Sequence, residues 1–144
     1  LRMTELALEE EPDFFVSDIE VARPGRTYTV DTLSTLHERM PEADFYYVVG
    51  GDTALDLANW RSFDRVARMT SFLVVQRPET DSEHVRLCAK CLRDRYGARI
   101  FLTDVRGPEI SSTELRARIV RGEDVSDELP PKVIDYIRKE KLYQ

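Results

Sequence analysis

The segment that decides the fold is Phe45-Tyr46-Tyr47-Val48-Val49-Gly50-Gly51-Asp52. Aromatic and β-branched residues favour strands, and an uninterrupted apolar run predicts a strand buried on both faces, as in a parallel sheet. The two glycines after it would let a ligand approach the backbone closely. Asp52 is well placed to accept hydrogen bonds from ribose hydroxyls. The pattern is not the G-x-G-x-x-G of dinucleotide-binding folds, however, so by itself it does not identify a nucleotide site.

Outward from this segment, strands and helices alternate along the whole chain. Further strands are predicted at residues 14–21, 72–75 and 100–102. Helices are predicted at residues 2–10, 31–40, 54–60, 63–69, 82–96 and 111–121, with a last one starting at Pro130-Pro131. This order predicts an α/β fold, a Rossmann-like doubly wound and mostly parallel sheet that binds ligands at the carboxyl ends of its strands. No linker or repeat divides it, so we expect one domain over residues 1–144.

The composition excludes several classes of protein. Hydrophobic residues make up 42% and charged residues 33% of the 144 positions, which is typical of a globular domain. The net charge of −6 disfavours general binding to nucleic acids or acidic membranes. No apolar run is long enough to cross a membrane, and no stretch resembles a signal peptide. We therefore expect a cytoplasmic protein without nucleic-acid or membrane partners.

The two cysteines form a single C-x-x-C pair, Cys88 and Cys91, inside a predicted amphipathic helix. No second Cys or His pair follows at ligand spacing, which argues against a closed zinc site. Both cysteines fall on the helix face that carries Leu87 and Leu92. We interpret them as reduced, half-buried core thiols rather than as a redox pair.

A helix start with clustered donors occurs at Ile110-Ser111-Ser112-Thr113-Glu114-Leu115-Arg116. Ser111 is a favourable N-cap, and Glu114 three residues later completes a capping-box pattern. The unpaired N–H groups and positive end of a helix start suit a phosphate, which Arg116 could reach with its bidentate guanidinium. The alternative is an ordinary capped helix with a surface arginine.

Two further segments have a structural and a functional interpretation. Thr29 or Asp31 can cap the helix at residues 31–40, and its free N–H groups could hold a carboxylate or carbonyl; a simple helix start is the alternative. Trp60 is the single tryptophan. It either packs in the core or stacks on a heterocycle, a contact worth about 1–3 kcal/mol.

Taken together and in order, these motifs resemble bacterial nicotinate-nucleotide adenylyltransferase. The resemblance covers about residue 2 to the end of the chain. It rests on motifs found in a fixed order: Tyr28-Thr29-x-Asp31-Thr32-Leu33, Gly50-x-Asp52, Trp60, Arg77-Pro78, Ile110-Ser111-Ser112-Thr113-x-x-Arg116, Tyr136-Ile137 and Leu142-Tyr143. It implies the nucleotidyltransferase type of Rossmann-like sheet. The implied reaction joins ATP and nicotinate mononucleotide into deamido-NAD and pyrophosphate, with Mg²⁺, in NAD biosynthesis.

The resemblance also assigns roles to residues of this chain. For the phosphates of ATP it implies a site formed by Ile110, Ser111, Ser112, Thr113 and Arg116. For the ribose of ATP it implies Gly50, Gly51 and Asp52. Arg116 and Ser111 would have the catalytic role, because they would neutralise charge on the departing pyrophosphate. For nicotinate mononucleotide it implies Tyr28, Thr29, Trp60 and Arg61. Trp60 would stack on the pyridine ring, and backbone N–H groups near Thr29 and Arg61 would receive the carboxylate.

One element of the family is absent from the sequence. The glycine-rich first strand with its H/T-x-G-H motif is missing, and His37 and His84 lie within predicted helices instead. We therefore expect the later strands and C-terminal helices of the fold without the N-terminal βαβ segment. Such a piece would expose strand edges and apolar sheet faces and would be inactive alone.

Several alternatives remain open at this point. One is a non-catalytic nucleotide-binding domain, and another is a related adenylyl- or cytidylyltransferase. A homo-oligomer is possible. The sequence does not decide between nicotinate and nicotinamide mononucleotide.

Overall fold

The computed structural model describes residues 1–76, 81–106 and 110–143. The chain forms two compact units. We call Gly25–Glu109 the sheet unit, and Leu1–Pro24 with Ile110–Gln144 the helical unit. The predicted single domain over residues 1–144 stays a prediction.

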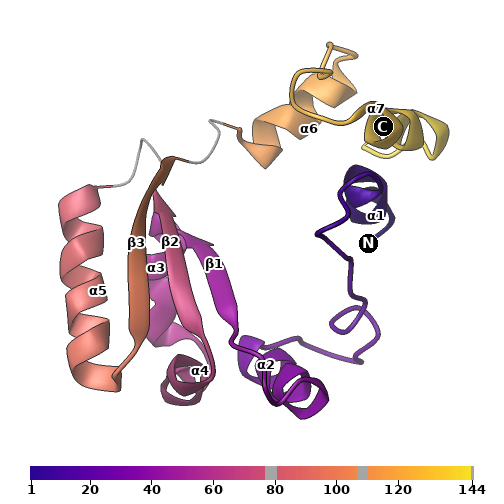
Figure 1. Cartoon of the computed structure of the whole chain (residues 1–144). Coiled ribbons are helices and arrows are strands. Elements are labelled where there is room, and N and C mark those ends of the chain that lie inside the picture. The colour runs from indigo at the N-terminus through magenta and orange to yellow at the C-terminus, as the bar shows by residue number, and fades with distance from the viewer. Residues whose placement is uncertain (77–80, 107–109, 144) are drawn as a thin grey trace. The chain divides into compact units, whose positions relative to one another are not determined.

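The sheet unit contains three parallel strands in the order β1-β2-β3. They are β1 (Tyr46–Gly50), β2 (Ser71–Gln76) and β3 (Arg99–Arg106). Between and before them lie α2 (Thr29–Arg39), α3 (Gly51–Asp56), the 3-10 turn Leu57–Asn59, α4 (Phe63–Met69) and α5 (Ser82–Tyr96). Figure 1 shows this alternation, which confirms the predicted α/β class with parallel strands.

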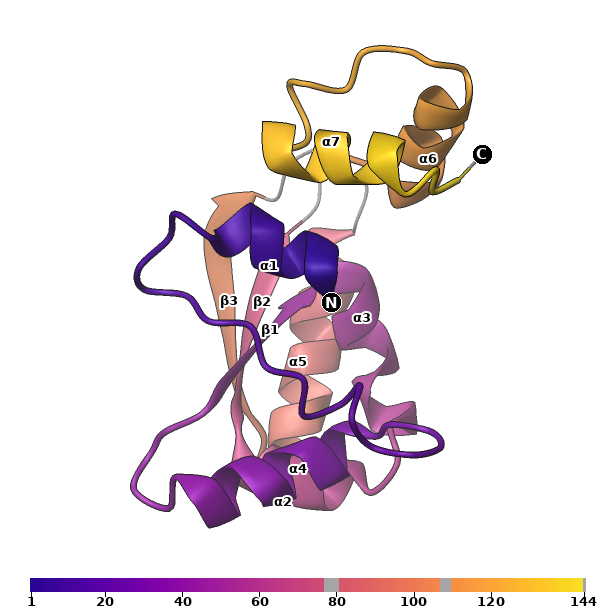
Figure 2. The same cartoon turned by 90° about the vertical axis from the view of Figure 1, so that its right-hand side faces the viewer.

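Helix α5 begins and ends where the sequence predicts. The Asp81 carboxylate accepts hydrogen bonds from the N–H groups of Glu83 and His84 at 2.9 and 3.4 Å, which caps the helix start. Gly97 ends the helix with a φ of 65°, a left-handed conformation that glycine adopts without steric cost. Helix α4 also has its predicted bounds, and it lies beside α2 in both views (Figures 1 and 2).

The core of the unit lies between one face of the sheet and these helices. Phe72 and Val74 of β2 and Leu57 after α3 are completely buried. The other buried core residues of the unit come from all three strands and from every helix. Because the strands present alternate residues to this face, Val49 is buried while Val48 is not.

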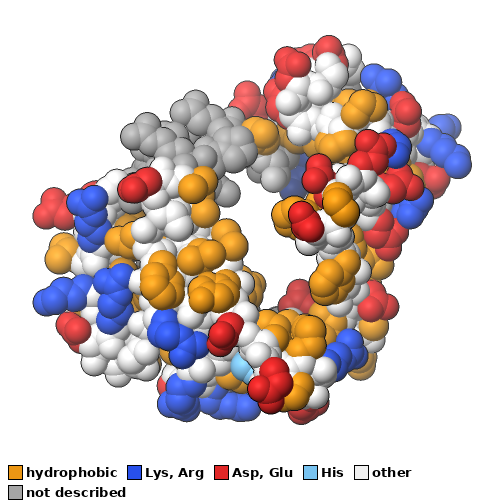
Figure 3. All heavy atoms as spheres, viewed as in Figure 1, with side chains coloured by type: hydrophobic (Ala, Val, Ile, Leu, Met, Phe, Trp, Pro, Cys, Tyr) orange, Lys and Arg blue, Asp and Glu red, His pale blue; other side chains and the backbone are white. Residues whose placement is uncertain are grey.

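The opposite sheet face is apolar and exposed. Val48, Leu73 and Phe101 are aligned across the three strands, and Val48 and Phe101 are 61% and 51% exposed. Figure 3 shows hydrophobic side chains gathered over these strands. The prediction that β1 is buried on both faces is therefore wrong, since the helices that contact the strands cover only one face. The expectation that the sheet exposes an apolar face is confirmed.

The predicted strand at residues 14–21 is also wrong. This segment consists of turns and irregular backbone, and its Phe14, Phe15 and Val21 are 63%, 83% and 70% exposed. A strand needs a partner for its backbone groups, and none of the described strands pairs with this one.

The helical unit contains α1 (Arg2–Leu8), α6 (Ser112–Val120) and α7 (Pro131–Lys139). Helix α1 contacts α7, and Lys132 at the start of α7 donates to Glu9 and Glu10 after α1. Val133, Ile134 and Ile137 are the buried residues of α7. Among the described residues, no helix has the length and hydrophobicity needed to span a membrane.

Candidate nucleotide site

The predicted phosphate segment forms the start of helix α6. Ser111 is its N-cap, and its Oγ accepts a hydrogen bond from the N–H of Glu114 at 3.4 Å, as the capping pattern predicts. Ser112 and Thr113 follow in the exposed first turn. The N–H groups at the start of an α-helix have no intrahelical acceptor, so this turn presents donors to an anion.

The arginines of this region differ in whether a carboxylate neutralises them. Arg118 donates to the Glu128 carboxylate and the Asp124 carbonyl, and Arg121 donates to Glu123, whose pKa this bond lowers. Arg116 is exposed, and within the described residues it forms no ion pair within 4.0 Å. Its guanidinium is therefore available to an external anion.

A groove of about 360 Å³ lies beside Arg116 within the helical unit. Its lining is mostly apolar and comes from α1, α6 and α7, with Met3, Thr4, Ala7, Ser112, Leu115, Arg116, Ile119, Leu129, Pro130, Val133, Ile137 and Tyr143. Ser112 and Arg116 share this groove, as expected of residues four apart on one helix. They supply polar groups at the α6 wall of the groove.

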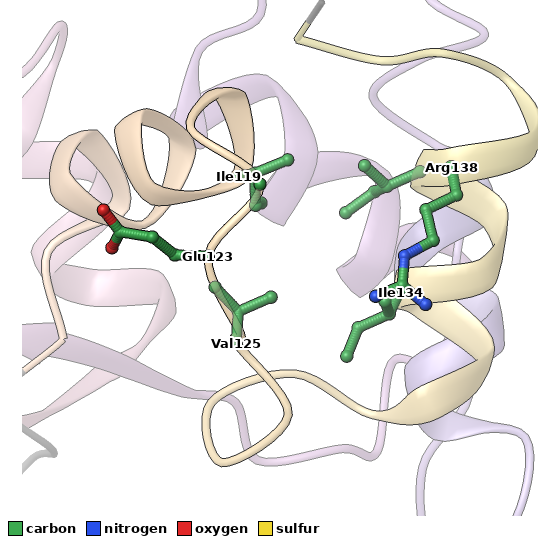
Figure 4. A pocket seen from close by; sticks show the side chains of 7 residues that line it. Ile119, Glu123, Val125, Ile134 and Arg138 are labelled. Atoms are coloured by element: carbon green, nitrogen blue, oxygen red, sulfur yellow. The ribbon is translucent and has the colours of Figure 1, made fainter.

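A smaller pocket of about 160 Å³ lies between α6 and α7 (Figure 4). Ile119, Val125, Ile134 and Ile137 form its apolar lining. Figure 4 shows the Glu123 carboxylate turned away from these side chains. None of the sequence-predicted site residues lines it, so we exclude it from the candidate site.

The predicted ribose segment lies at the junction of β1 and α3. Gly50 ends the strand and caps α3 with φ −74° and ψ 160°, a conformation open to any residue. Neither Gly50 nor Gly51 has a positive φ, so the backbone angles do not require glycine. Close approach of a ligand remains the functional explanation. Asp52 is exposed in the first turn of α3, where its carboxylate can accept hydrogen bonds.

Helix α2 starts differently from the prediction. Tyr28 is its N-cap, and no side chain caps it, so neither Thr29 nor Asp31 has that role. The carbonyl of Tyr28 accepts from the N–H groups of Asp31 and Thr32 at 3.0 and 3.2 Å. The helix therefore begins two residues earlier than the alternation of apolar residues indicates. The Thr29 N–H that the resemblance assigns to the carboxylate lies in its first turn.

Trp60 is half-buried and packs against the core, which is the first of its two predicted environments. Its ring makes edge contacts with Tyr47 and Phe72, with centroids 5.5 and 6.4 Å apart and interplanar angles of 73° in both pairs. These contacts attach Trp60 to the core. Neither neighbour stacks parallel to the indole, so stacking of a heterocycle on Trp60 stays a prediction.

The contact between Arg61 and Tyr28 could not be read from the sequence. The Cζ atom of Arg61 lies over the Tyr28 ring, 4.4 Å from its centroid, in a cation–π arrangement. The two residues are 33 positions apart, and no local pattern links them. The structure thus brings together two residues that the resemblance assigns separately to the nicotinate side.

The hydrogen bonds of Cys88 and His37 are with residues outside the candidate site. Cys88 is half-buried, and its Sγ donates to the Ala54 carbonyl at 3.6 Å. Burial raises the pKa of this thiol, and the neighbouring Cys91 adds to the effect. Cys91 is exposed, so the prediction of two half-buried thiols is wrong for that residue. His37 binds the Met69 carbonyl at 2.8 Å, and His84 is exposed on α5.

The candidate residues are thus divided between the two units. Tyr28, Thr29, Gly50–Asp52, Trp60 and Arg61 belong to the sheet unit, and Ile110–Arg116 to the helical unit. The Arg77-Pro78 motif lies outside the described residues.

Comparison with known proteins relates both groups to one family. The profile of the cytidylyltransferase-like family matches residues 1–118. Probable nicotinate-nucleotide adenylyltransferases of Clostridium tetani and Lachnoclostridium phytofermentans are 30% and 36% identical over 142 and 141 residues. These matches cover 99% and 98% of this chain and 71% and 70% of the relatives.

Solved structures show the same fold. The nicotinic acid mononucleotide adenylyltransferase of Plasmodium falciparum, complexed with APC, matches with a TM-score of 0.71 and 23% identity. The same enzyme complexed with NaAD gives a TM-score of 0.72. The matches cover 99% of this chain and 73% and 71% of the two solved chains. The Rossmann-like nucleotidyltransferase fold expected from the sequence is confirmed.

Proposed function

The chain belongs to the cytidylyltransferase-like family, among the nicotinate-nucleotide adenylyltransferases, and on that premise we propose that it transfers the adenylyl group of ATP to nicotinate mononucleotide. The products are deamido-NAD and pyrophosphate, and the reaction belongs to NAD biosynthesis. The structural observation that carries the proposal is Arg116. It lies one turn into a Ser111-capped helix and lacks an ion-pair partner in the described part of the chain, whereas Arg118 and Arg121 are neutralised.

The chemistry needs positioning and charge stabilisation rather than a protein nucleophile. A phosphate oxygen of nicotinate mononucleotide attacks the α-phosphorus of ATP. The new P–O bond forms as the bond to the β-phosphate breaks, and pyrophosphate leaves with the electron pair. Arg116 and the N–H groups of Ser112 and Thr113 stabilise negative charge on the leaving group. Ser111 holds this helix start in place, with Ile110 preceding it.

The sheet unit supplies the remaining contacts in this proposal. Asp52 and the Gly50-Gly51 backbone bind the adenosine ribose. Trp60 stacks on the pyridine ring, and N–H groups near Thr29 and Arg61 receive the carboxylate beside Tyr28. The exposure of Asp52 and the absence of parallel stacking on Trp60 by its two aromatic neighbours support these roles.

Magnesium fits this site as a companion of ATP. In the described ranges, no three His, Cys, Asp or Glu side chains cluster where they could hold a metal ion. Mg²⁺ usually keeps several waters and binds substrate phosphates with one or two carboxylates, so a dedicated protein cage is not needed. A bound Mg²⁺ would offset phosphate charge, and the chain's own part is to direct Arg116 and the helix start at the ATP phosphates. The use of ATP favours the cytoplasm as the compartment.

An assay of pyrophosphate release tests the proposal. The assay uses the protein as it occurs in its cell rather than residues 1–144 alone. That protein should release pyrophosphate from ATP only when nicotinate mononucleotide is present, and mass spectrometry should detect deamido-NAD. CTP in place of ATP is the matched control for a cytidylyltransferase. Nucleotide binding without pyrophosphate release would instead identify a non-catalytic nucleotide-binding protein.

A further inference from the structure

We propose that the Tyr28–Arg61 pair selects the acid over the amide form of the pyridine nucleotide, with Arg61 as the specificity residue and Tyr28 as its positioning residue. The inference rests on the proposed function and deepens it. The role goes beyond the backbone N–H groups assigned to this end of the substrate, because it depends on the charged side chain of Arg61.

The geometry holds the guanidinium in one place. A long arginine side chain at the surface samples many rotamers, and stacking on an aromatic face restricts them. Here Cζ of Arg61 lies 4.4 Å from the centroid of the Tyr28 ring. Tyr28 is itself packed against the core and is the N-cap of α2. The ring is therefore a fixed support for the charge.

The charge of Arg61 is not used by another residue in the described part of the chain. No carboxylate lies within 4.0 Å of it there, whereas Arg68 on the following helix pairs with Asp64 at 3.0 Å. A guanidinium stacked on a ring keeps its edge N–H groups free for a second partner. Arg61 can therefore donate hydrogen bonds to a carboxylate while its guanidinium stays on the Tyr28 ring.

The position of the pair relates it to the pyridine ring. Arg61 directly follows Trp60, so their Cα atoms are about 3.8 Å apart. A pyridine ring on the indole would place its substituent near both residues. Nicotinate carries a carboxylate there and nicotinamide a neutral amide. A fixed positive charge attracts the carboxylate more strongly than the neutral amide. Arg61 would therefore favour nicotinate over nicotinamide rather than bind both equally.

A purely structural role for the pair predicts a different result. The contact joins the start of α2 to the segment before α4, so it could serve only to hold them together. Loss of such a tether would weaken both nucleotides equally. The ratio of kcat/KM for nicotinate mononucleotide to kcat/KM for nicotinamide mononucleotide separates the two cases, because it cancels effects common to both substrates.

The experiment measures this ratio in the natural protein and in five variants. Arg61→Met should lower it at least 10-fold. Arg61→Lys keeps the charge but loses the planar group that stacks on Tyr28, so it should lower the ratio less than Arg61→Met does. Tyr28→Leu should lower it about 3-fold or more because the guanidinium loses its support, whereas Tyr28→Phe, which keeps a ring face, should stay within about 2-fold. Arg65→Ala is the matched control: it removes an exposed arginine of α4 and should leave the ratio unchanged.

Two results would overturn the inference. One is an unchanged ratio in Arg61→Met, and the other is an equal fall for both nucleotides in Arg61→Met and Tyr28→Leu. Thermal melting of each variant checks folding, and quenching of Trp60 fluorescence by each nucleotide gives the ratio of Kd values independently of turnover. If the unsubstituted protein adenylylates neither nucleotide, the proposed function fails. If it adenylylates the acid but Arg61→Met does so with the same preference, only this inference fails.

Discussion

Lys132 and Glu9 form an ion pair between residues 123 positions apart, with Nζ of Lys132 2.9 Å from Oε2 of Glu9. A second bond of 2.7 Å joins Lys132 to Glu10. The pair connects the end of α1 to the start of α7. The hydrogen bond and charge of Lys132 lower the pKa of Glu9, and the bonds to both carboxylates raise the pKa of Lys132.

These pKa shifts predict the pH range in which the bonds of Lys132 to Glu9 and Glu10 stabilise the protein. Because its pKa is lowered on folding, the Glu9 carboxylate contributes stability at a pH above its ordinary pKa of 4.5, and this contribution is lost as the pH falls below that value. Because its pKa is raised on folding, the Lys132 ammonium contributes stability at a pH below its ordinary pKa of 10.5, and this contribution is lost as the pH rises above that value. Lys132→Met should therefore lower Tm at pH 7 but not at pH 3. The effect should be small and weaken with salt, since the groups are exposed. The same difference in Tm at both pH values would contradict it.

Arg116→Ala should lower kcat/KM for ATP about 100-fold, because a charge-assisted contact to the leaving group is lost. Its free energy of unfolding should change by less than about 0.5 kcal/mol, since no described residue pairs with it. Arg121→Ala is the matched control, because it removes an arginine near the end of the same helix that is already paired with Glu123. Steady-state kinetics and thermal melting measure both. Full activity in Arg116→Ala would remove Arg116 from the site.

Trp60→Ala should raise KM for nicotinate mononucleotide about 10-fold, the loss of roughly 1.4 kcal/mol of stacking, with little change for ATP. It should also destabilise the fold by about 2 kcal/mol through the lost contacts with Tyr47 and Phe72. Trp60→Phe keeps a flat ring and should show less of both effects. The two substrates are titrated separately in each variant. Equal weakening of both would favour a core role alone.

Cys91 should react first with a chromogenic disulfide reagent at pH 8, and Cys88 much more slowly, because burial raises the pKa of Cys88. A thiol pKa raised on folding favours the native state below its ordinary value of 9.0, and this contribution is lost as the pH rises above it. Changing both cysteines to alanine should cost about 1 kcal/mol or less and leave activity intact. Lost activity together with bound zinc would reverse this interpretation.

The sequence predicted those elements whose ends are set by local chemistry. Helix α5 ends at Gly97 because the left-handed turn needs glycine, and α6 begins after Ser111 because its hydroxyl caps the helix. The strand proposed at residues 14–21 failed because strand pairing is a tertiary property. Strand β3 extends from Arg99 to Arg106, beyond the apolar residues 100–102, because its pairing with β2 continues past them.

The candidate site shows the same division. The capped start of α6 follows from adjacent residues, so Arg116 could be named from the sequence. Arg116 has no ion-pair partner among the described residues, whereas Arg118 is bound to Glu128. This difference depends on the loop before α7, which no local pattern describes. The Tyr28–Arg61 contact depends on how α2 meets the segment before α4.

The strand order β1-β2-β3 has a consequence for how the sheet unit assembles. β2 and β3 each pair with the strand made just before them, so every new pairing closes only the helical connection between consecutive strands. Closing such a connection costs less entropy than pairing strands that are far apart in the sequence. During synthesis, β1 is already available when β2 emerges, and β2 when β3 does. The unit can thus grow strand by strand in the direction of translation, without waiting for a distant part of the chain.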